Sequence, residues 1–297
     1  MKNKLSFLLI LILAVGCSEN KNKAEQGNAV SGSFTIFVDK NSYPLVKVLS
    51  ESFLSVYPDI EIAFDTGNGS EMISKIASLK VQSAVSCRPI SEQDSLALNS
   101  RKIFFRQFHF VSDAVAVITN KSDSTIIQNL SDPVSLFTDC EHKSGLKICT
   151  TNPGSDINYS ITQLIPGAAA CMKNWVNAET AQGVFNLVST TRGYAGLIPW
   201  SMLSDSDDPL VEQMRDSVNI LSLNGTLTPT EKFSPVQSNI ASAEYPLVQK
   251  LYLITSEPYS GPASGFAAYI ASAEGQRVIR LFGLLPSKMP TREIVIP

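Results

Sequence analysis

The chain has 297 residues, of which 44% are hydrophobic, 17% charged and 8% aromatic. This balance is that of a globular protein long enough for two modest lobes, and it excludes the collagen-like, low-complexity and disulfide-knot classes. The 24 Lys and Arg residues against 27 Asp and Glu residues give a net charge of -3, and there is no basic block. We therefore expect no nucleic-acid partner, because nucleic-acid binders carry a basic patch.

The first residues have the pattern of an export signal. Lys2 and Lys4 give a positive start, and an apolar stretch runs from Leu5 to Val15. A stretch of about eleven residues fits the apolar region of a signal peptide and is shorter than the roughly 20 residues that a helix needs to cross a bilayer. We therefore expect residues 1–16 to be a signal peptide that is removed on export.

The signal ends in LAVGC (13–17), which resembles the lipobox of bacterial lipoproteins. In that pattern small residues precede a cysteine that is lipidated and becomes the first residue of the mature protein. The pattern more often has Leu where this chain has Ala14, and the alternative is a chance cysteine after an ordinary signal peptide. The resemblance implies a lipid on Cys17 that anchors the protein in the bacterial cell envelope, facing the periplasm or the cell exterior.

The segment after Cys17 is poor in apolar residues. Residues 18–32, SENKNKAEQGNAVSG, contain no aromatic residue and one Val, which is too little apolar surface to drive folding. We expect residues 17–32 to form a lipidated, flexible tether. A coil of this length spans on the order of 20 Å and would hold a folded body just off the membrane.

Four cysteines remain in the body of the chain: Cys87, Cys140, Cys149 and Cys171. With no C-x-x-C pair and two histidines, the sequence does not suggest a zinc site or any other metal site. Disulfides can form in an oxidising compartment. We expect Cys140 to pair with Cys149 and close a short loop, with Cys171 as a competing partner for either. Cys87 is expected to be a small buried residue.

Strands and helices alternate from Ser33 onward. The pattern predicts strands at 34–38 and 60–64 and helices at 43–57 and 70–80. In the first helix Leu45, Leu49 and Phe53 recur at four-residue spacing before Pro58, as in an amphipathic helix. Such βαβ units specify a mostly parallel sheet flanked by helices, in which ligands bind at the carboxyl ends of strands.

The second half of the chain continues in the same style. Strands are predicted at 113–120, 146–150 and 194–199, in a second sheet, and a strand at 251–255 precedes a helix at 265–282. No internal repeat of fixed period is present. These elements predict an α/β protein.

Seven short segments occur along the chain in a characteristic order. They are YPL (43–45), GNGS (67–70), SCRPI (86–90), DAVAVI (113–118), NPGS (152–155), YPL (245–247) and EGQ (274–276), the last followed by Gly283 and Pro286. Together they resemble the substrate-binding proteins of bacterial phosphate ABC transporters, which are two-lobed periplasmic binding proteins of type II. The SCRPI segment corresponds to S-S-R-P-L in that family, and the likeness covers residues 33–297.

The resemblance implies a two-lobed α/β fold. Each lobe would be a mostly parallel sheet flanked by helices, and a strand hinge would join the lobes. Residues 33–113 and 245–297 would form lobe 1, and residues 114–244 lobe 2. The ligand would lie in the cleft between the lobes, which close over it by a hinge motion.

A tetrahedral oxyanion needs many donors in a dry cleft, and the free backbone N–H groups at helix N-termini supply them. Three loops offer such donors: 39–42, 67–70 and 152–157. Gly67 and Gly69 allow the backbone to approach a ligand closely, although the same pair also fits an ordinary turn capped by Ser70.

Arg88 is the most specific charged candidate, because its guanidinium could bind two oxyanion oxygens from the end of an apolar strand. The alternative is a structural Arg paired with a carboxylate. The candidate ligand-binding residues are Asn41, Ser42, Asn68, Gly69, Ser70, Arg88, Ser155 and Asp156. Three weaker candidates are each expected to be a solvated surface group: Lys40, Asp156 and Arg192.

Two loops depart from the family pattern. The first loop of the family is rich in Ser and Thr, but here it is DKN (39–41), and Asp39 would repel a dianion unless it were protonated or turned away. In the third loop an Arg of the family corresponds to Thr151, and Ser-Gly-Thr corresponds to SDI (155–157). The resemblance therefore implies the fold more strongly than it implies the ligand.

The leading hypothesis is an exported, lipid-anchored, monomeric solute-binding protein that needs no cofactor. It would capture phosphate or a similar oxyanion and present it to the membrane permease of an ABC-type uptake system. The alternative is a diverged sensing or interaction module of the same fold, which the altered loops favour. An enzyme is not expected, because the chain lacks G-x-S-x-G, H-E-x-x-H and G-x-x-x-x-G-K-[ST] motifs and has two histidines.

Overall fold

The computed structural model describes residues 27–124 and 132–288. The predicted signal peptide, the predicted lipidation site Cys17 and most of the predicted tether lie outside these residues. Residues 27–31, the end of the predicted tether, form a turn in which Asn28 bridges to Ser31, and the backbone of Ala29 packs against Gly265. Within the described part, no helix is both long and apolar enough to cross a membrane.

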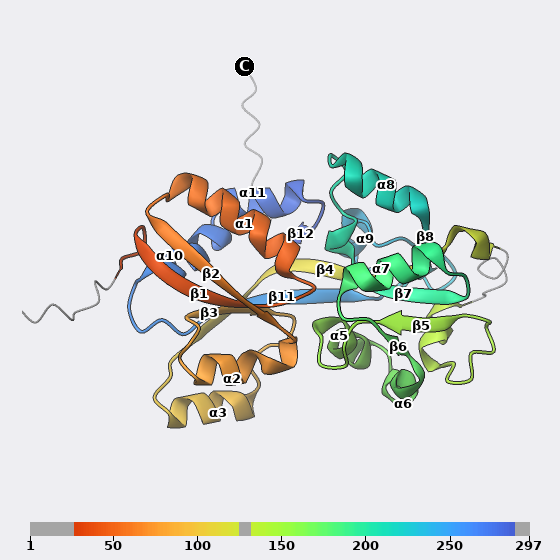
Figure 1. The fold of residues 1–297 in the computed structure, drawn as a ribbon, viewed down its shortest axis with the longest axis horizontal. Coiled ribbons are helices and arrows are strands. Elements are labelled where there is room, and N and C mark those ends of the chain that lie inside the picture. The colour runs from red at the N-terminus through yellow and green to blue at the C-terminus, as the bar shows by residue number, and fades with distance from the viewer. Residues whose placement is uncertain (1–26, 125–131, 289–297) are drawn as a thin grey trace, which may run out of the picture.

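A single curved sheet runs through the molecule (Figure 1). Its order is β2 (Ile60–Gly67), β1 (Gly32–Asp39), β3 (Ser83–Ser86), β11 (Val248–Thr255), β4 (Arg106–Asn120), β7 (Tyr194–Pro199), β5 (Lys147–Thr150) and β6 (Val176–Asn177). The outer strands of each lobe pair in parallel, whereas β11 and β4 are antiparallel to their neighbours. The sheet is therefore mixed, where the sequence predicted mostly parallel sheets.

Strand β4 belongs to both lobes. Its first part, up to Ala114, pairs with β11, and from Val115 onward it pairs with β7. Two short strands, β8 (Val218–Ile220) and β12 (Leu285–Pro286), also pair with β4. In Figure 1, β4 and β11 run across the middle of the molecule between the two lobes.

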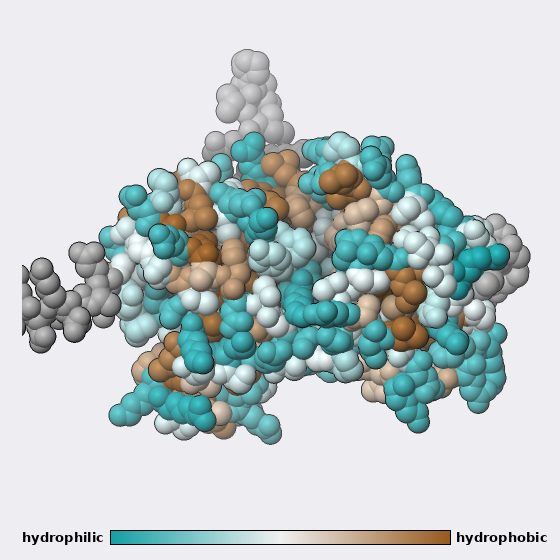
Figure 2. Space-filling view, in the orientation of Figure 1, coloured by the Kyte–Doolittle hydropathy of each residue, from teal (hydrophilic) through white to brown (hydrophobic). Residues whose placement is uncertain are grey.

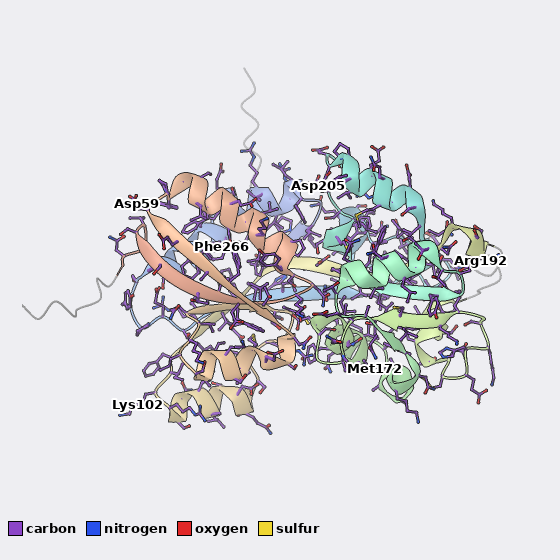
Figure 3. All side chains as sticks on the ribbon, in the orientation of Figure 1. Asp59, Lys102, Met172, Arg192, Asp205 and Phe266 are labelled. Atoms are coloured by element: carbon purple, nitrogen blue, oxygen red, sulfur yellow. A yellow bond between two sulfur atoms is a disulfide. The ribbon has the colours of Figure 1, made fainter. Side chains whose placement is uncertain are left out.

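Helices cover both faces of the sheet in lobe 1. One face carries α1 (Tyr43–Val56), α10 (Pro262–Ala271) and α11 (Ala273–Leu281), and the other carries α2 (Met72–Ala77) and α3 (Glu92–Ser100) (Figure 1). Leu45, Leu49 and Phe53 are buried, as their spacing in the sequence predicts. The ring of Phe53 lies 5.2 Å from that of Phe266, which Figure 3 shows beneath α1. The amphipathic face of α1 thus forms the core of this lobe.

Lobe 2 is layered in the same way. Figure 1 shows α7 (Ala181–Thr190), α8 (Pro209–Ser217) and α9 (Gln237–Ala241) on one side of the sheet, and α5 (Asp156–Leu164) and α6 (Ala168–Cys171) on the other. A separate pair, β9 (Leu223–Asn224) and β10 (Lys232–Phe233), is antiparallel. The short 3-10 helices are η1 (Gly69–Glu71), η2 (Lys121–Asp123), η3 (Pro133–Thr138), η4 (Met172–Asn174) and η5 (Trp200–Met202).

Two predicted helices are interrupted. The helix expected at 265–282 is divided into α10 and α11 at Ser272, whose backbone is extended and whose hydroxyl accepts a hydrogen bond from the Gly275 N–H at 3.3 Å. Ser272 therefore caps a new helix, as Ser does at an N-cap. The helix expected at 70–80 is η1 followed by α2, which ends at Ala77.

The predicted pairing of Cys140 with Cys149 is wrong. Cys140 forms a disulfide with Cys171, and their Cα atoms are 4.7 Å apart. Cys140 follows η3, which packs on α6, whereas Cys149 is buried inside strand β5 with its thiol in the core. Position in the fold, and not closeness in sequence, therefore decides the pairing. Cys87 is a free, buried thiol, as predicted.

Candidate functional site

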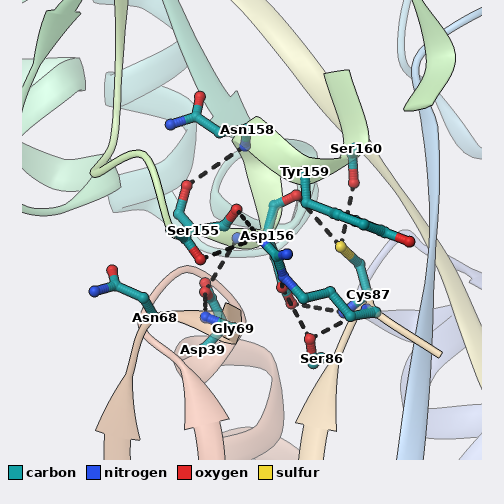
Figure 4. A network of polar contacts seen from close by, with 12 residues as sticks. Asp39, Asn68, Gly69, Ser86, Cys87, Ser155, Asp156, Asn158, Tyr159 and Ser160 are labelled. Carbon is teal, nitrogen blue, oxygen red and sulfur yellow. Dashed lines mark hydrogen bonds and ion pairs between the residues drawn. The ribbon is translucent and has the colours of Figure 1, made fainter. Parts of the chain in front are cut away.

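The candidate site lies where the carboxyl ends of β1, β2 and β3 in lobe 1 meet the β5–α5 turn of lobe 2 (Figure 4). Carboxyl ends of parallel strands are the usual ligand-binding edge of an α/β sheet. In this structure the lobes touch directly here, since the Ser70 N–H donates to the Gly154 carbonyl at 3.1 Å. The site is closed, and the chain's own carboxylates lie inside it.

Asp39, the last residue of β1, is fully buried. Its Oδ1 accepts hydrogen bonds from the backbone N–H and the side-chain Nδ2 of Asn41, at 2.9 and 2.8 Å. Its Oδ2 accepts from the backbone N–H groups of Gly69, at 2.7 Å, and Asp156, at 3.1 Å. Backbone donors from three separate loops therefore converge on one carboxylate.

Asp156, the first residue of α5, is 1% exposed. Its Oδ1 accepts from the Ser86 hydroxyl at 2.8 Å and lies 3.3 Å from the Arg88 Nε, and its Oδ2 accepts from the Cys87 N–H at 2.6 Å. The sequence predicted a solvated surface group. That prediction is wrong, because closure of the lobes buries the start of α5 against the end of β3.

Arg88 has partners other than a ligand. Its guanidinium pairs with Asp156, donates through Nη2 to the carbonyls of Gly154 and Ser155 at 3.1 Å each, and stacks over Tyr159 at 4.3 Å. The side chain is 23% exposed. In this closed structure Arg88 therefore has the geometry of the structural alternative, an Arg paired with a carboxylate.

Burial shapes the electrostatics of this cluster. It raises the pKa of Asp156 to about 7, helped by the negative charge of Asp39, while the donors on Cys87, Ser86 and Arg88 act in the opposite direction. Burial likewise raises the pKa of Asp39 against the effect of its backbone donors. The pKa of the Cys87 thiol is raised well above its usual value, first by burial and then by Asp156. Cys87 is therefore a protonated thiol and not a nucleophile.

The remaining lobe 1 candidates surround this cluster. Ser42 is buried and is the N-cap residue of α1, but its side chain makes no capping bond. Asn68 caps η1, and its backbone N–H and side-chain amide both donate to Glu71, at 3.0 and 3.2 Å. The Nδ2 of Asn41 lies 3.5 Å from the hydroxyl of Thr151 in lobe 2. These groups position the loops, and Gly69 supplies a donor directly.

In lobe 2, Ser155 is the N-cap of α5. Its hydroxyl accepts from the Asn158 N–H at 3.4 Å and from the Thr151 hydroxyl at 2.8 Å. The carbonyl of Thr151 in turn accepts from the Asn158 amide at 2.9 Å. This network fixes the start of α5 and thereby aims the Asp156 N–H and carboxylate into the junction.

Two glycines allow the lobes to approach this closely. A Cβ on Gly69 would lie 1.8 Å from the Asp156 Oδ1, and a Cβ on Gly154 would lie 2.5 Å from the Ser70 hydroxyl. From the sequence, Gly69 is expected to let the backbone approach a ligand closely. The group that approaches it is a carboxylate from the same chain.

The weaker cationic candidates lie outside the cluster. Lys40 forms an ion pair of 3.0 Å with Glu179, across the edge of the junction. Arg192 pairs with the buried Asp123 at 3.3 Å, and Figure 3 shows it at the outer end of lobe 2. Arg192 is therefore too far from the junction to take part in the site.

Asp39, Ser86 and Cys87 are not among the ligand-binding residues predicted from the sequence. Each ends or follows a strand of lobe 1, which is a usable signal, but a carboxylate was expected to repel the ligand. Which backbone donors would surround Asp39 could not be read from the sequence, because the donors come from loops that are distant in the chain.

A cavity of about 440 Å³ lies beside the cluster on lobe 2. Its lining residues are Arg88, Thr150, Pro153, Asn158, Tyr159, Thr162, Met172, Lys173 and Asn177. Neither Asp39 nor Asp156 lines it. The residues described contain no group of three or more His, Cys, Asp and Glu side chains placed to hold a metal ion.

Hydrophilic side chains cover most of the face shown in Figure 2, with hydrophobic residues in separate small groups.

The family model of the PBP superfamily domain matches residues 23–274. The phosphate-binding protein PstS of Bacillus subtilis (strain 168) is 21% identical over an aligned length of 300, which covers 94% of this chain and 92% of that protein.

Solved structures share the fold. A protein of Clostridium perfringens, named as a phosphate ABC transporter substrate-binding protein and solved with bound phosphate, has a TM-score of 0.67 at 16% identity, over 86% of this chain and 100% of that one. An ABC-type phosphate transport receptor from Vibrio cholerae has a TM-score of 0.58 at 17% identity, over the same shares. These relatives are named as binding and transport proteins and not as enzymes, in agreement with the prediction.

Proposed function

The chain belongs to the PBP superfamily, and we propose that it is an exported solute-binding protein that captures phosphate or a similar oxyanion between its lobes for an ABC-type uptake system. One observation carries the proposal: hydrogen-bond donors from four loops converge on anionic oxygen atoms in a closed, buried junction. The phosphate-binding relatives support an oxyanion as the captured solute.

The donors are of the kind that an oxyanion requires. The N–H of Asp156 opens α5, that of Gly69 opens η1, and that of Cys87 follows β3, so none of them is used inside a regular helix or strand. Ser86 adds a hydroxyl and Arg88 a positive charge. Buried donors of this type bind anions strongly because water does not compete for them.

We propose that capture uses a hinge between the lobes, with the boundaries expected from the sequence: 33–113 with 245–297, and 114–244. The change of β4 from β11 to β7 between Ala114 and Val115 supports the first boundary. Few strands cross between the lobes, so opening would leave the core of each lobe intact.

The proposal includes anchoring by a lipid on Cys17 in the cell envelope, a monomeric state and delivery of the solute to a membrane permease. The order of the signal stretch, small residues and cysteine supports the anchor. A Cys17→Ser change should release the protein from the membrane fraction and remove the mass of the lipid from its N-terminus. An unmodified Cys17 in the wild-type protein would rule out the anchor.

The experiment that tests solute capture is calorimetry of the mature chain with Cys17→Ser, titrated with phosphate, sulfate, molybdate and small carboxylates. The proposal expects saturable binding of phosphate or another of these oxyanions at one site. The same titration of Gly69→Val, which places side-chain atoms against Asp156, should show no binding. Absence of binding by all of the oxyanions at every pH from 5 to 8 would contradict the proposal.

A second function has a specific observation in its favour. The donors that would hold an anion are already bonded to Asp39 and Asp156. A sensing or interaction module would keep such a closed cleft and use its surface instead. In that case the protein would bind none of the oxyanions, and variants in the junction would affect only its stability.

A further inference from the structure

We infer that Asp39 and Asp156 act as an internal ligand, whose two carboxylates hold the lobes closed in the place of a captured solute. The part of the inference that concerns oxyanions rests on the proposed function. The part that concerns closure stands on the contacts alone. An external anion would then bind only by displacing the two carboxylates from their donors.

Both carboxylates cross the junction. Asp39 belongs to lobe 1 and accepts from the Asp156 N–H of lobe 2 at 3.1 Å. Asp156 belongs to lobe 2 and accepts from lobe 1 through Ser86 and Cys87, at 2.8 and 2.6 Å. A solute held between two lobes does the same, because its oxygens accept from both sides at once. The pair therefore closes the lobes in the way that a ligand would.

Hydrogen-bond donors satisfy both carboxylates completely. Every oxygen of the pair has at least one hydrogen-bond donor, and both side chains are almost completely buried. A dianion placed beside them would meet the negative charge of the pair in a medium of low polarity, which is strongly unfavourable. Anion binding and the present position of the carboxylates thus exclude each other.

The backbone leaves no room for a third group at this point. The hypothetical Cβ of Gly69 would be 1.8 Å from the Asp156 Oδ1 and 3.1 Å from the Ser86 hydroxyl. The carboxylate of Asp156 therefore rests directly on the Gly69 backbone. An anion reaching that backbone would have to take the space that Asp156 now fills.

Competition of this kind has a measurable consequence. If the internal ligand keeps most molecules closed and occupied, the apparent affinity for an external anion falls by the fraction of molecules in which the donors are free. Removing a carboxylate should raise the affinity for phosphate by about tenfold or more, and it should open the lobes when phosphate is absent.

The test uses the mature chain with Cys17→Ser and compares it with Asp39→Gly, Asp156→Gly and the more conservative Asp39→Asn and Asp156→Asn. Small-angle scattering reports closure, and calorimetry with phosphate and with sulfate reports binding. Asp123→Asn is the matched control, because Asp123 is also buried, pairs with an Arg at 3.3 Å and accepts a backbone N–H from Gly193 at 2.8 Å, but lies away from the junction.

We expect the wild-type protein and Asp123→Asn to be equally compact, and the junction variants to have a larger radius of gyration at unchanged helical content. Variants that open but bind neither anion would support the internal ligand and overturn oxyanion capture. Junction variants as compact as the wild type would overturn the internal ligand. Tight phosphate binding by the wild type, weakened in the variants, would also overturn it while supporting oxyanion capture.

Discussion

At the scale of single residues, the site is determined by which atoms satisfy buried donors. The sequence indicated three of the loops that meet at the junction, because glycine and Ser at strand ends indicate turns with free N–H groups. It could not show that Asp39 and Asp156 satisfy those donors, since each carboxylate accepts hydrogen bonds from loops at least 30 residues away. Long-range pairing of polar groups is not encoded in local pattern.

Gly69→Ala should separate the lobes. The added methyl group would lie 1.8 Å from the Asp156 Oδ1, a distance that requires the two loops to move apart. We expect a loss of about 1 to 3 kcal/mol in the free energy of unfolding and a larger radius of gyration. Gly183→Ala in α7, where the nearest atom is 3.3 Å away, is the control and should be neutral or slightly stabilising. An unchanged radius for Gly69→Ala would mean that the junction is not tightly closed.

Arg88→Ala should affect stability. Its removal leaves the buried Asp156 carboxylate without its cation, and removing one partner of such a pair costs about 2 to 4 kcal/mol. Arg192→Ala removes a guanidinium at the same 3.3 Å distance from Asp123, but that side chain is 68% exposed, so the loss should be below about 1 kcal/mol. Denaturant unfolding of both variants is the measurement. If the two variants lose the same amount of unfolding free energy, and Arg88→Ala also weakens phosphate binding strongly, Arg88 is a ligand residue.

The raised pKa of Asp156 predicts an unusual pH dependence. Its pKa in the native protein is about 7, above the ordinary 3.8, so the native state binds more protons than the unfolded chain between these values. Stability from this group is therefore lost as pH rises from about 4 to about 7. The raised pKa values of Asp39 and Asp113 act in the same direction, whereas the lowered pKa of half-buried His109 acts in the opposite one.

The check is the melting temperature of the wild type and of Asp156→Asn across this pH range at constant ionic strength. The difference between the two melting temperatures separates the effect of Asp156 from those of His109 and Asp113, because both proteins retain these two residues. The charged or titratable groups that face Asp156 are Asp39, Cys87 and Arg88, and all are retained in the variant. The wild type should lose stability relative to the variant as pH rises, and a difference that stays constant with pH would contradict the shift.

At the scale of elements, periodicity was a good guide wherever one face is buried. The helix that starts at Tyr43 and the strand Tyr194–Pro199 have the predicted positions, because apolar spacing and the flanking Pro residues set them. The division at Ser272 was missed, since a polar residue in a helical pattern resembles a solvent-facing position. The extended backbone of Ser272 and the hydrogen bond that its hydroxyl accepts from the Gly275 N–H distinguish a cap from a surface residue.

The disulfide joins α6 to the segment that follows η3. Cys140 and Cys171 are separated by 31 residues in the chain, and closing a loop of this length stabilises a protein by about 3 to 4 kcal/mol in the chain-entropy account. Peptide mapping without reduction should recover the Cys140–Cys171 pair and leave Cys149 as a thiol that is alkylated only after unfolding. Recovery of a Cys140–Cys149 peptide would overturn the assignment and restore the pairing expected from the sequence.

At the scale of the whole molecule, the order of seven motifs identified a two-lobed fold, and the structural relatives share it. What the motifs could not specify is the state of the cleft. The departures in the first and third loops put both aspartates at the junction, and the fold then brings them within reach of each other's loops. The architecture is therefore that of a solute-binding protein, with the chain's own carboxylates in the solute's position.

The most direct test is a crystal structure of the mature protein with Cys17→Ser, grown once without added anions and once with phosphate. Without anions, the account predicts closed lobes with the Asp39 Oδ2 bonded to the N–H groups of Gly69 and Asp156. With phosphate, it predicts either the same arrangement or a bound anion with both carboxylates displaced. Open lobes in the anion-free crystal, or phosphate bound beside undisplaced carboxylates, would contradict it.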